Sequence, residues 1–128
     1  MLAVSTNTRN VEVMATTASM NGGYLRVYGA PRPPAPEVAV TSQVLFVELR
    51  FATSAFAPPV NGVAQVTTIP AGAILASGMP TWFRAFAEDG VTAILDGDIG
   101  EDLDLSQSRI ISGGTFSVVS LVYYIPNP

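Results

Sequence analysis

Three reactive side chains are missing from this chain of 128 residues: it has no histidine, no cysteine and no lysine, so that all six basic residues are arginine. Without histidine and cysteine the chain cannot build a Ser-His-Asp or Cys-His catalytic arrangement or a His/Cys metal site. Without lysine it can form neither a Schiff base nor a P-loop. We therefore expect no enzymatic activity, no catalytic residue and no cofactor-binding residue.

Charge is also scarce, because only 12% of the residues are charged, about half of the usual proportion of roughly 25%. The net charge is -4 and the mean hydropathy is +0.39. An acidic protein is repelled by phosphates, so we expect no nucleic-acid partner. A monomer with so few charges exposes apolar patches and tends to associate, and a preference for arginine over lysine is typical of interfaces.

Two interpretations of this composition remain open. Other protein subunits cover much of the surface, including copies of this chain in a dimer or trimer, or else the surface is the neutral Thr/Ser/Gly-rich exterior of an ordinary β-protein. No apolar run approaches the roughly 18 residues of a membrane span, so we expect no membrane partner. The first residues also lack the basic and apolar regions of a secretory signal.

Short alternating segments separated by turn residues predict an all-β fold of about eight strands, in a sandwich or a barrel. The Asp89-Gly90 pair is a typical hairpin turn. We expect core positions at Val47, Leu49, Phe51, Phe83 and Val119. The segments with strand character are 24–28, 43–51, 63–69, 73–76, 81–87, 91–95, 103–105, 109–111 and 115–125.

The first 22 residues differ from the remainder. Apolar residues at helical spacing over 9–20, followed by Gly22 and Gly23, predict a short helix, and an extended arm is the alternative. We therefore divide the chain into an N-terminal arm or short helix, 1–22, and a β-sandwich domain, 23–128.

Prolines are concentrated between Gly29 and Pro36, in Gly-Ala-Pro-Arg-Pro-Pro-Ala-Pro. Proline fixes φ and removes a hydrogen-bond donor, so this segment is extended and lies outside any sheet. It is either a stiff loop between strands or a preorganised docking arm, which would lose little entropy on binding.

Most of the acidic residues fall between Glu88 and Asp104. We interpret them as a solvated acidic loop and expect no metal ligand; a calcium site in 96–104 is the alternative, although the spacing differs from that of an EF-hand. The ring of Trp82 is predicted to pack in the core or an interface, or else to stack on a sugar.

Taken together, several segments resemble one known family. They are Gly29-Ala-Pro-Arg-Pro-Pro-Ala-Pro36, the strand 44–51, Trp82-Phe-Arg84, Asp96-Gly-Asp-Ile-Gly100 and Asp102-Leu-Asp-Leu105. Their order resembles the capsid cement, or decoration, proteins of tailed bacteriophages. The resemblance covers roughly residues 22–125 and contains no catalytic signature.

The resemblance implies a jelly-roll β-sandwich on the outer surface of a virion capsid, where it bridges and stabilises subunits of the major capsid protein. A head-fibre, tail or baseplate module with a glycan-binding role is the alternative. We expect contacts through the N-terminal segment, the proline arm with Arg32 pairing with capsid carboxylates, and three exposed rings. The candidate contact residues are Val11, Val13, Met14, Met20, Tyr24, Tyr28, Arg32, Pro33, Pro34 and Trp82.

Overall fold

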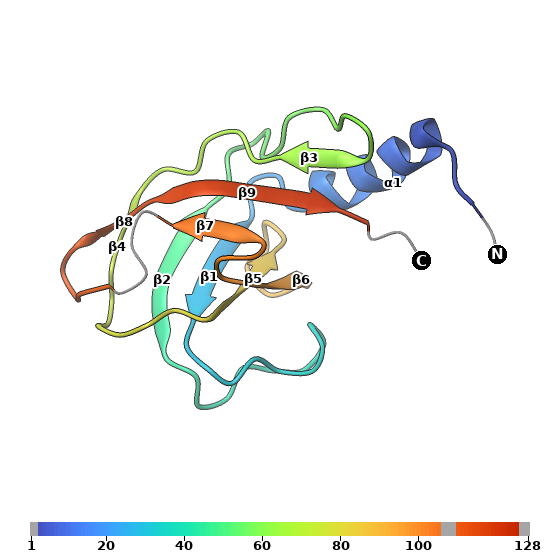
Figure 1. Cartoon of the computed structure of the whole chain (residues 1–128). Helices are drawn as coiled ribbons and strands as arrows, with labels where there is room; N and C mark the ends of the chain where they lie inside the picture. The colour runs from blue at the N-terminus through green and yellow to red at the C-terminus, as the bar shows by residue number, and fades with distance from the viewer. Residues whose placement is uncertain (1–2, 106–109, 126–128) are drawn as a thin grey trace.

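The computed structural model describes residues 3–105 and 110–125, which form one helix and nine strands (Figure 1). This is a mostly β architecture built from antiparallel sheets, so the predicted all-β class is confirmed. The elements are, in chain order, α1 Thr6–Ala18, β1 Tyr24–Tyr28, β2 Leu45–Arg50, β3 Val63–Gln65, β4 Gly72–Ala73, β5 Trp82–Phe86, β6 Ala93–Asp98, β7 Leu103–Leu105, β8 Thr115–Phe116 and β9 Val118–Tyr124.

The strands form three sheets. A four-stranded sheet has the order β2-β1-β5-β6, a three-stranded sheet has the order β3-β9-β7, and β4 pairs with β8 alone. Every pair of neighbouring strands is antiparallel. Of the predicted strand 109–111, Arg109 lies outside the described residues, and Ile110 forms a single bridge with Gly78.

The N-terminal segment is a helix and not an extended arm. Ser5 caps α1, because its Oγ accepts a hydrogen bond from the backbone N–H of Thr8 at 3.2 Å, and such a cap satisfies one of the free amides of the first turn. The helix therefore begins earlier than predicted. After it, Gly23 passes so close to β5 that a Cβ there would lie 2.0 Å from the Phe86 carbonyl oxygen.

The core lies between one face of the four-stranded sheet and the two smaller sheets. The sheets contribute buried side chains such as Val27, Phe83, Leu103 and Phe116. Helix α1 adds Val13 to the same cluster. The predicted core residues Val47, Leu49, Phe51 and Phe83 are confirmed as buried.

Val119 is wrong as a core residue, because 63% of it is exposed. The register between β7 and β9 shifts at this point: Asp104 opposes Ser120, whereas the next residue, Leu105, opposes Val118. Val119 is therefore the extra residue of a β-bulge, which reverses the alternation of the strand. As a result, Val118 packs against the core instead.

The predicted hairpin turn at Asp89-Gly90 is confirmed between β5 and β6. Asp89 Oδ1 accepts hydrogen bonds from the backbone N–H groups of Val91 and Thr92, both at 2.8 Å, and its Oδ2 accepts one from the Thr92 hydroxyl. These hydrogen bonds, with that of the Thr92 side chain the strongest, lower the pKa of Asp89. Gly90 has a φ of +71°, which glycine adopts without strain.

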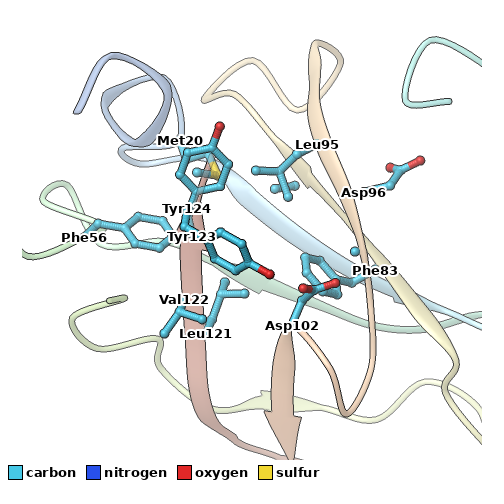
Figure 2. Close-up of a pocket in the computed structure, with 12 residues that line it drawn as sticks. Met20, Phe56, Phe83, Leu95, Asp96, Asp102, Leu121, Val122, Tyr123 and Tyr124 are labelled. Atoms are coloured by element: carbon cyan, nitrogen blue, oxygen red, sulfur yellow. The ribbon is translucent and has the colours of Figure 1, made fainter. Parts of the chain in front are cut away.

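One side of the core is open between β6 and β9, where a cavity of about 160 Å³ remains (Figure 2). Its walls are mostly apolar, and the carboxylate of Asp102 lies among them. The Asp96 side chain, by contrast, points away from the cavity in Figure 2. The lining residues are Met20, Phe56, Phe83, Ala85, Leu95, Asp96, Gly97, Asp102 and 121–124.

Candidate interaction surfaces

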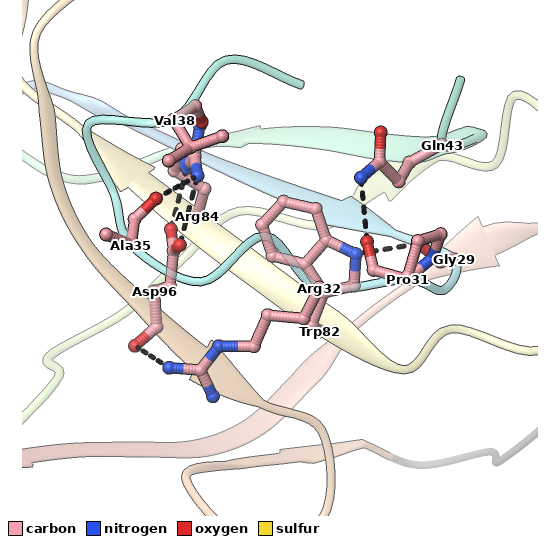
Figure 3. Close-up of polar contacts among 9 residues, drawn as sticks. All are labelled: Gly29, Pro31, Arg32, Ala35, Val38, Gln43, Trp82, Arg84 and Asp96. Carbon is pink, nitrogen blue, oxygen red and sulfur yellow. Dashed lines mark hydrogen bonds and ion pairs between the residues drawn. The ribbon is translucent and has the colours of Figure 1, made fainter. Parts of the chain in front are cut away.

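The proline segment, defined here as residues 29–38, covers the face of the four-stranded sheet that is turned away from the core. Alternation along β5 places Phe83 and Ala85 in the core cluster. Trp82 and Arg84 therefore face the other way, towards the proline segment (Figure 3). Both are nevertheless buried, so this segment and the sheet enclose a second, smaller interior.

Arg84 holds the proline segment in place. Its guanidinium forms two hydrogen bonds with the carboxylate of Asp96, at 2.7 and 3.0 Å, and donates to the carbonyl oxygens of Val38 at 2.8 Å and Ala35 at 3.2 Å (Figure 3). The hydrogen bond with Asp96 raises the pKa of Arg84. Only 3% of Arg84 is exposed, so the buried charge is both paired and hydrogen-bonded, as burial requires.

Sequence reasoning named Arg84 only as part of the Trp82-Phe-Arg84 segment and gave it no structural role, although a signal was present. Arg84 lies between Trp82 and Phe86 on the same face of an alternating strand, where a charged residue is unusual if that face is buried. A proline-rich segment has many carbonyl oxygens and few N–H groups of its own, so a five-donor guanidinium suits it.

Trp82 and Tyr28 are buried, so the prediction that they are exposed contact rings is wrong. The Trp82 Nε1–H donates to the Gly29 carbonyl oxygen at 2.7 Å, and the two rings stack with their centroids 4.7 Å apart. The proline segment covers them, which the strand pattern alone could not indicate. Because no surface of Trp82 is exposed, it cannot serve as a sugar-stacking platform in this conformation.

The other candidate residues of this region lie at different depths. Arg32 is exposed, and its guanidinium forms an ion pair with Asp98 at 2.9 Å. Pro34 is also exposed, whereas Pro33 is buried, which corrects its assignment as a contact residue. Tyr24 is half-buried beside two guanidinium groups, those of Arg26 and Arg50, 5.7 and 5.0 Å from its ring centre.

Three acidic residues between Glu88 and Asp104, namely Asp96, Asp98 and Asp102, make separate contacts within the chain. Asp96 pairs with Arg84 and Asp98 pairs with Arg32. Asp102 Oδ2 accepts a hydrogen bond from the Asp98 backbone N–H at 2.9 Å. Within residues 3–105 and 110–125, no three acidic side chains gather in a way that could hold a metal ion.

Helix α1 divides its apolar residues between the core and the solvent. Val13 is buried in the core cluster, and Met20, just beyond the helix, is buried there too. This corrects their assignment as contact residues, because the helix turns that side towards the sheets. Val11 and Met14 are 60% and 53% exposed, so they remain candidates.

Strand β3 and the end of β9 lie next to α1 (Figure 1). The helix packs against the turn before β3, where the Gly62 N–H donates to Asn10 Oδ1 at 2.8 Å. Val63 on β3 is paired with Tyr124 on β9. We call this the helix-end surface and define it by its exposed residues Val11, Met14, Val60, Val63 and Tyr124.

A second group of exposed apolar side chains lies beside β4 and β8, which Figure 1 places at the opposite end from α1. We call it the far-end surface and define it by Leu75, Met79 and Ile111. Backbone hydrogen bonds between Gly78 and Ile110, at 2.9 and 3.0 Å, hold the two contributing loops together.

Comparisons with known proteins provide no relative: no family model, no curated protein and no solved structure matches this chain. Among the described residues, no helix has the length and apolar character needed to span a membrane.

Proposed function

We propose that this chain is a capsid cement protein, which binds the outer surface of a tailed-phage head and bridges neighbouring subunits of the major capsid protein. The observation that carries the proposal is the presence of two exposed apolar surfaces at opposite ends of one small, sparsely charged molecule. A bridging protein needs two separate contact surfaces, whereas a protein that binds a single partner needs only one.

The composition supports the same function. The helix-end surface presents Val11 and Met14, and the far-end surface presents Leu75 and Ile111. Exposed apolar groups of this kind mark interaction sites. A contact of about 800 Å² per partner is a standard interface, and many copies acting together resist the outward strain of packaged DNA.

The jelly-roll topology of the resembling family is part of this proposal, and antiparallel sheets around one core support it. Assembly into a dimer or trimer is part of it as well, because the apolar surfaces that suit a capsid also suit a second copy. The net charge of -4 favours the outer side of the shell, since an acidic protein is repelled by the DNA inside.

The decisive experiment mixes the purified chain with undecorated phage heads and measures co-sedimentation and the temperature at which the heads release DNA. We expect saturable binding and a higher release temperature. Binding of the chain to tail tips or host glycans, with no binding to heads, would overturn the proposal in favour of a tail or baseplate module.

Variants at each end test the bridge. Met14→Asp at the helix end and Ile111→Asp at the far end each place a charge in one surface. Each variant should therefore need at least about ten-fold more protein to stabilise the heads to the same degree. Val91→Asp is the matched control, because Val91 is 80% exposed at the hairpin tip and belongs to neither surface. Equal binding by all three variants would show that neither surface is used.

A further inference from the structure

Two strand edges that no further strand covers, among the residues that the structure describes, lie on either side of the cavity between β6 and β9. Strand β6 is the last strand of the four-stranded sheet and has β5 as its single neighbour. Strand β7 pairs with β9 from Val118 only as far as Leu121. Over the described residues Val122–Tyr124, strand β9 is therefore paired with β3 on one side and with no strand on the other.

The backbone of β9 presents hydrogen-bonding groups to this open side. The Leu121 carbonyl accepts a hydrogen bond from the Val66 N–H, on the β3 side. Successive residues of an antiparallel strand direct their peptide groups to opposite sides. The N–H and C=O groups of Val122 and Tyr124 consequently point away from β3. Those of Val122 face Asp102, which precedes Leu103 in the register with Leu121. Those of Tyr124 lie beyond β7, where an additional strand could pair with them.

The size of the cavity indicates what such a strand would insert. At about 160 Å³, it is smaller than the roughly 300–1,000 Å³ of ordinary small-molecule pockets. An apolar cavity of about 150 Å³ accepts a benzene-sized group. Phe56, Phe83 and Leu95 provide apolar walls, so one aromatic side chain fits both the volume and the chemistry.

The Asp102 carboxylate gives this groove a charge preference. Its Oδ2 accepts a hydrogen bond from the Asp98 N–H, and its Oδ1 has no hydrogen bond to any residue that the structure describes. Figure 2 shows the Tyr123 hydroxyl pointing towards the same carboxylate. An arginine or lysine on the inserted strand, two residues from the aromatic anchor, would lie on the same side and reach Asp102.

We propose that this groove binds an extended segment of a partner protein, which pairs with β9 beyond the end of β7, places one aromatic side chain in the cavity and sets a basic residue beside Asp102. The inference rests on the proposed function only for the identity of the partner, the major capsid protein; the groove itself is defined without it.

A second copy of this chain does not offer the required segment. Every aromatic residue that lies two positions from an arginine belongs to β1 or β5, at Tyr24, Tyr28, Trp82 and Phe86. Both strands are already paired on both sides within the four-stranded sheet. The groove therefore requires a partner of different sequence.

The test exploits the absence of cysteine from the chain. The variant Glu101→Cys places a single thiol on the exposed turn beside Asp102. It is equilibrated, in excess 2-mercaptoethanol, with the peptide Cys-Gly-Ser-Thr-Val-Phe-Thr-Arg-Val-Thr supplied as its disulfide with 2-mercaptoethanol. Thiol–disulfide exchange releases 2-mercaptoethanol, and the protein–peptide disulfide is quantified by mass spectrometry. Tethering raises the effective concentration of a weakly binding segment.

We expect this peptide to tether at least roughly ten-fold better than the same peptide with serine in place of phenylalanine, because the burial of one aromatic ring is lost. A peptide with glutamate in place of arginine should also tether less. The backbone amide of Tyr124 should gain protection from hydrogen exchange in the tethered complex.

Two controls separate specific from general effects. At Ser112→Cys, on the exposed turn before β8, all three peptides should tether equally. In Glu101→Cys/Asp102→Asn, which keeps an oxygen acceptor for the Asp98 N–H, the preference for arginine over glutamate should disappear while the preference for phenylalanine persists. Asp102→Asn thus tests the charge without removing the cavity.

Equal tethering of the three peptides at Glu101→Cys, or no protection of the Tyr124 amide, would overturn the inference. So would sedimentation of the unmodified chain as an oligomer that the peptide dissociates, because a second copy would then occupy the groove. Peptide binding without head binding would support the groove and disprove the capsid function. Head binding without peptide binding would support the capsid function and disprove the groove.

Discussion

Helix α1 and the proline segment were both predicted from the sequence as docking elements, but they differ in how the rest of the chain holds them. The helix leaves Val11 and Met14 in solvent and contributes only one side to the core. The proline segment is held along its length by Trp82, Arg84 and Gln43, which donate hydrogen bonds to its carbonyl oxygens.

The difference lies in which groups each segment leaves unsatisfied. The helix satisfies its own backbone, so its spare groups are apolar side chains that can meet a partner. Within the proline segment the Val38 N–H donates to the Ala35 carbonyl oxygen, but prolines leave it few donors of its own. Its other carbonyl oxygens therefore bind donors from the sheet and from Gln43, and the segment becomes an internal part of the fold. We therefore expect substitutions under the proline segment to affect stability, and substitutions on the helix to affect binding.

The largest loss is expected for Arg84→Met. This change leaves the Asp96 carboxylate, whose side chain is 1% exposed, buried without its partner and removes two donors from the proline segment. Breaking a buried pair in this way costs about 3–5 kcal/mol of unfolding free energy, measurable by urea denaturation. The double variant Arg84→Met/Asp96→Leu should recover part of the loss; no recovery would mean that the carbonyl contacts dominate.

A smaller loss is expected for Trp82→Phe, which keeps an aromatic ring against Tyr28 but removes the donor to the Gly29 carbonyl. Leaving a buried acceptor unsatisfied costs about 1–3 kcal/mol. Hydrogen exchange should also accelerate in residues 29–38 and remain unchanged in α1. Faster exchange in both regions would contradict their independence.

Alkaline pH should act on the same interior. Burial raises the pKa of Tyr28 above its ordinary value of 10.0, so the fold favours the neutral phenol. This contribution to stability is complete below pH 10 and decreases as the pH rises towards the higher pKa of the folded state. The variant Tyr28→Phe should lack this part of the alkaline decline in thermal stability; an identical decline in both proteins would contradict it.

The smallest changes are expected outside this interior. Val11→Ser and Met14→Ser on the helix should each change the unfolding free energy by less than about 0.5 kcal/mol, although both should weaken head binding. Arg32→Gln removes an exposed ion pair with Asp98, which is worth about 0–1 kcal/mol. If urea denaturation showed a loss of more than about 2 kcal/mol of unfolding free energy for any of the three, that residue would be part of the stabilising interior, as Arg84 and Trp82 are.

Local periodicity was enough to predict much of the fold. Tyr24–Tyr28 was predicted with its observed boundaries, and the Asp89-Gly90 hairpin was predicted from two residues. Val119 escaped prediction because a bulge depends on the register with another strand. For Trp82, packing in the interior was one of the predicted alternatives and is confirmed. The segment that covers it was not predicted, because that segment lies far away in the chain and leaves no local pattern in β5.

The candidate surfaces were predicted less completely. Val11 and Met14 were found from composition and helical spacing, and they are exposed. Exposed apolar residues in loops, such as Leu75 and Ile111, have no periodicity that separates them from core residues. The groove between β6 and β9 is a property of two sheet edges, so only the folded arrangement reveals it.

The attachment of the proline segment also has a consequence for the order of events during synthesis. The segment leaves the ribosome well before its partners. Arg84 lies 46 positions after Val38, and Asp96 comes later still. Until both have emerged and β5 has joined β6, its carbonyl oxygens must be hydrated by water. The nascent protein therefore completes this face only after the four-stranded sheet exists to receive it.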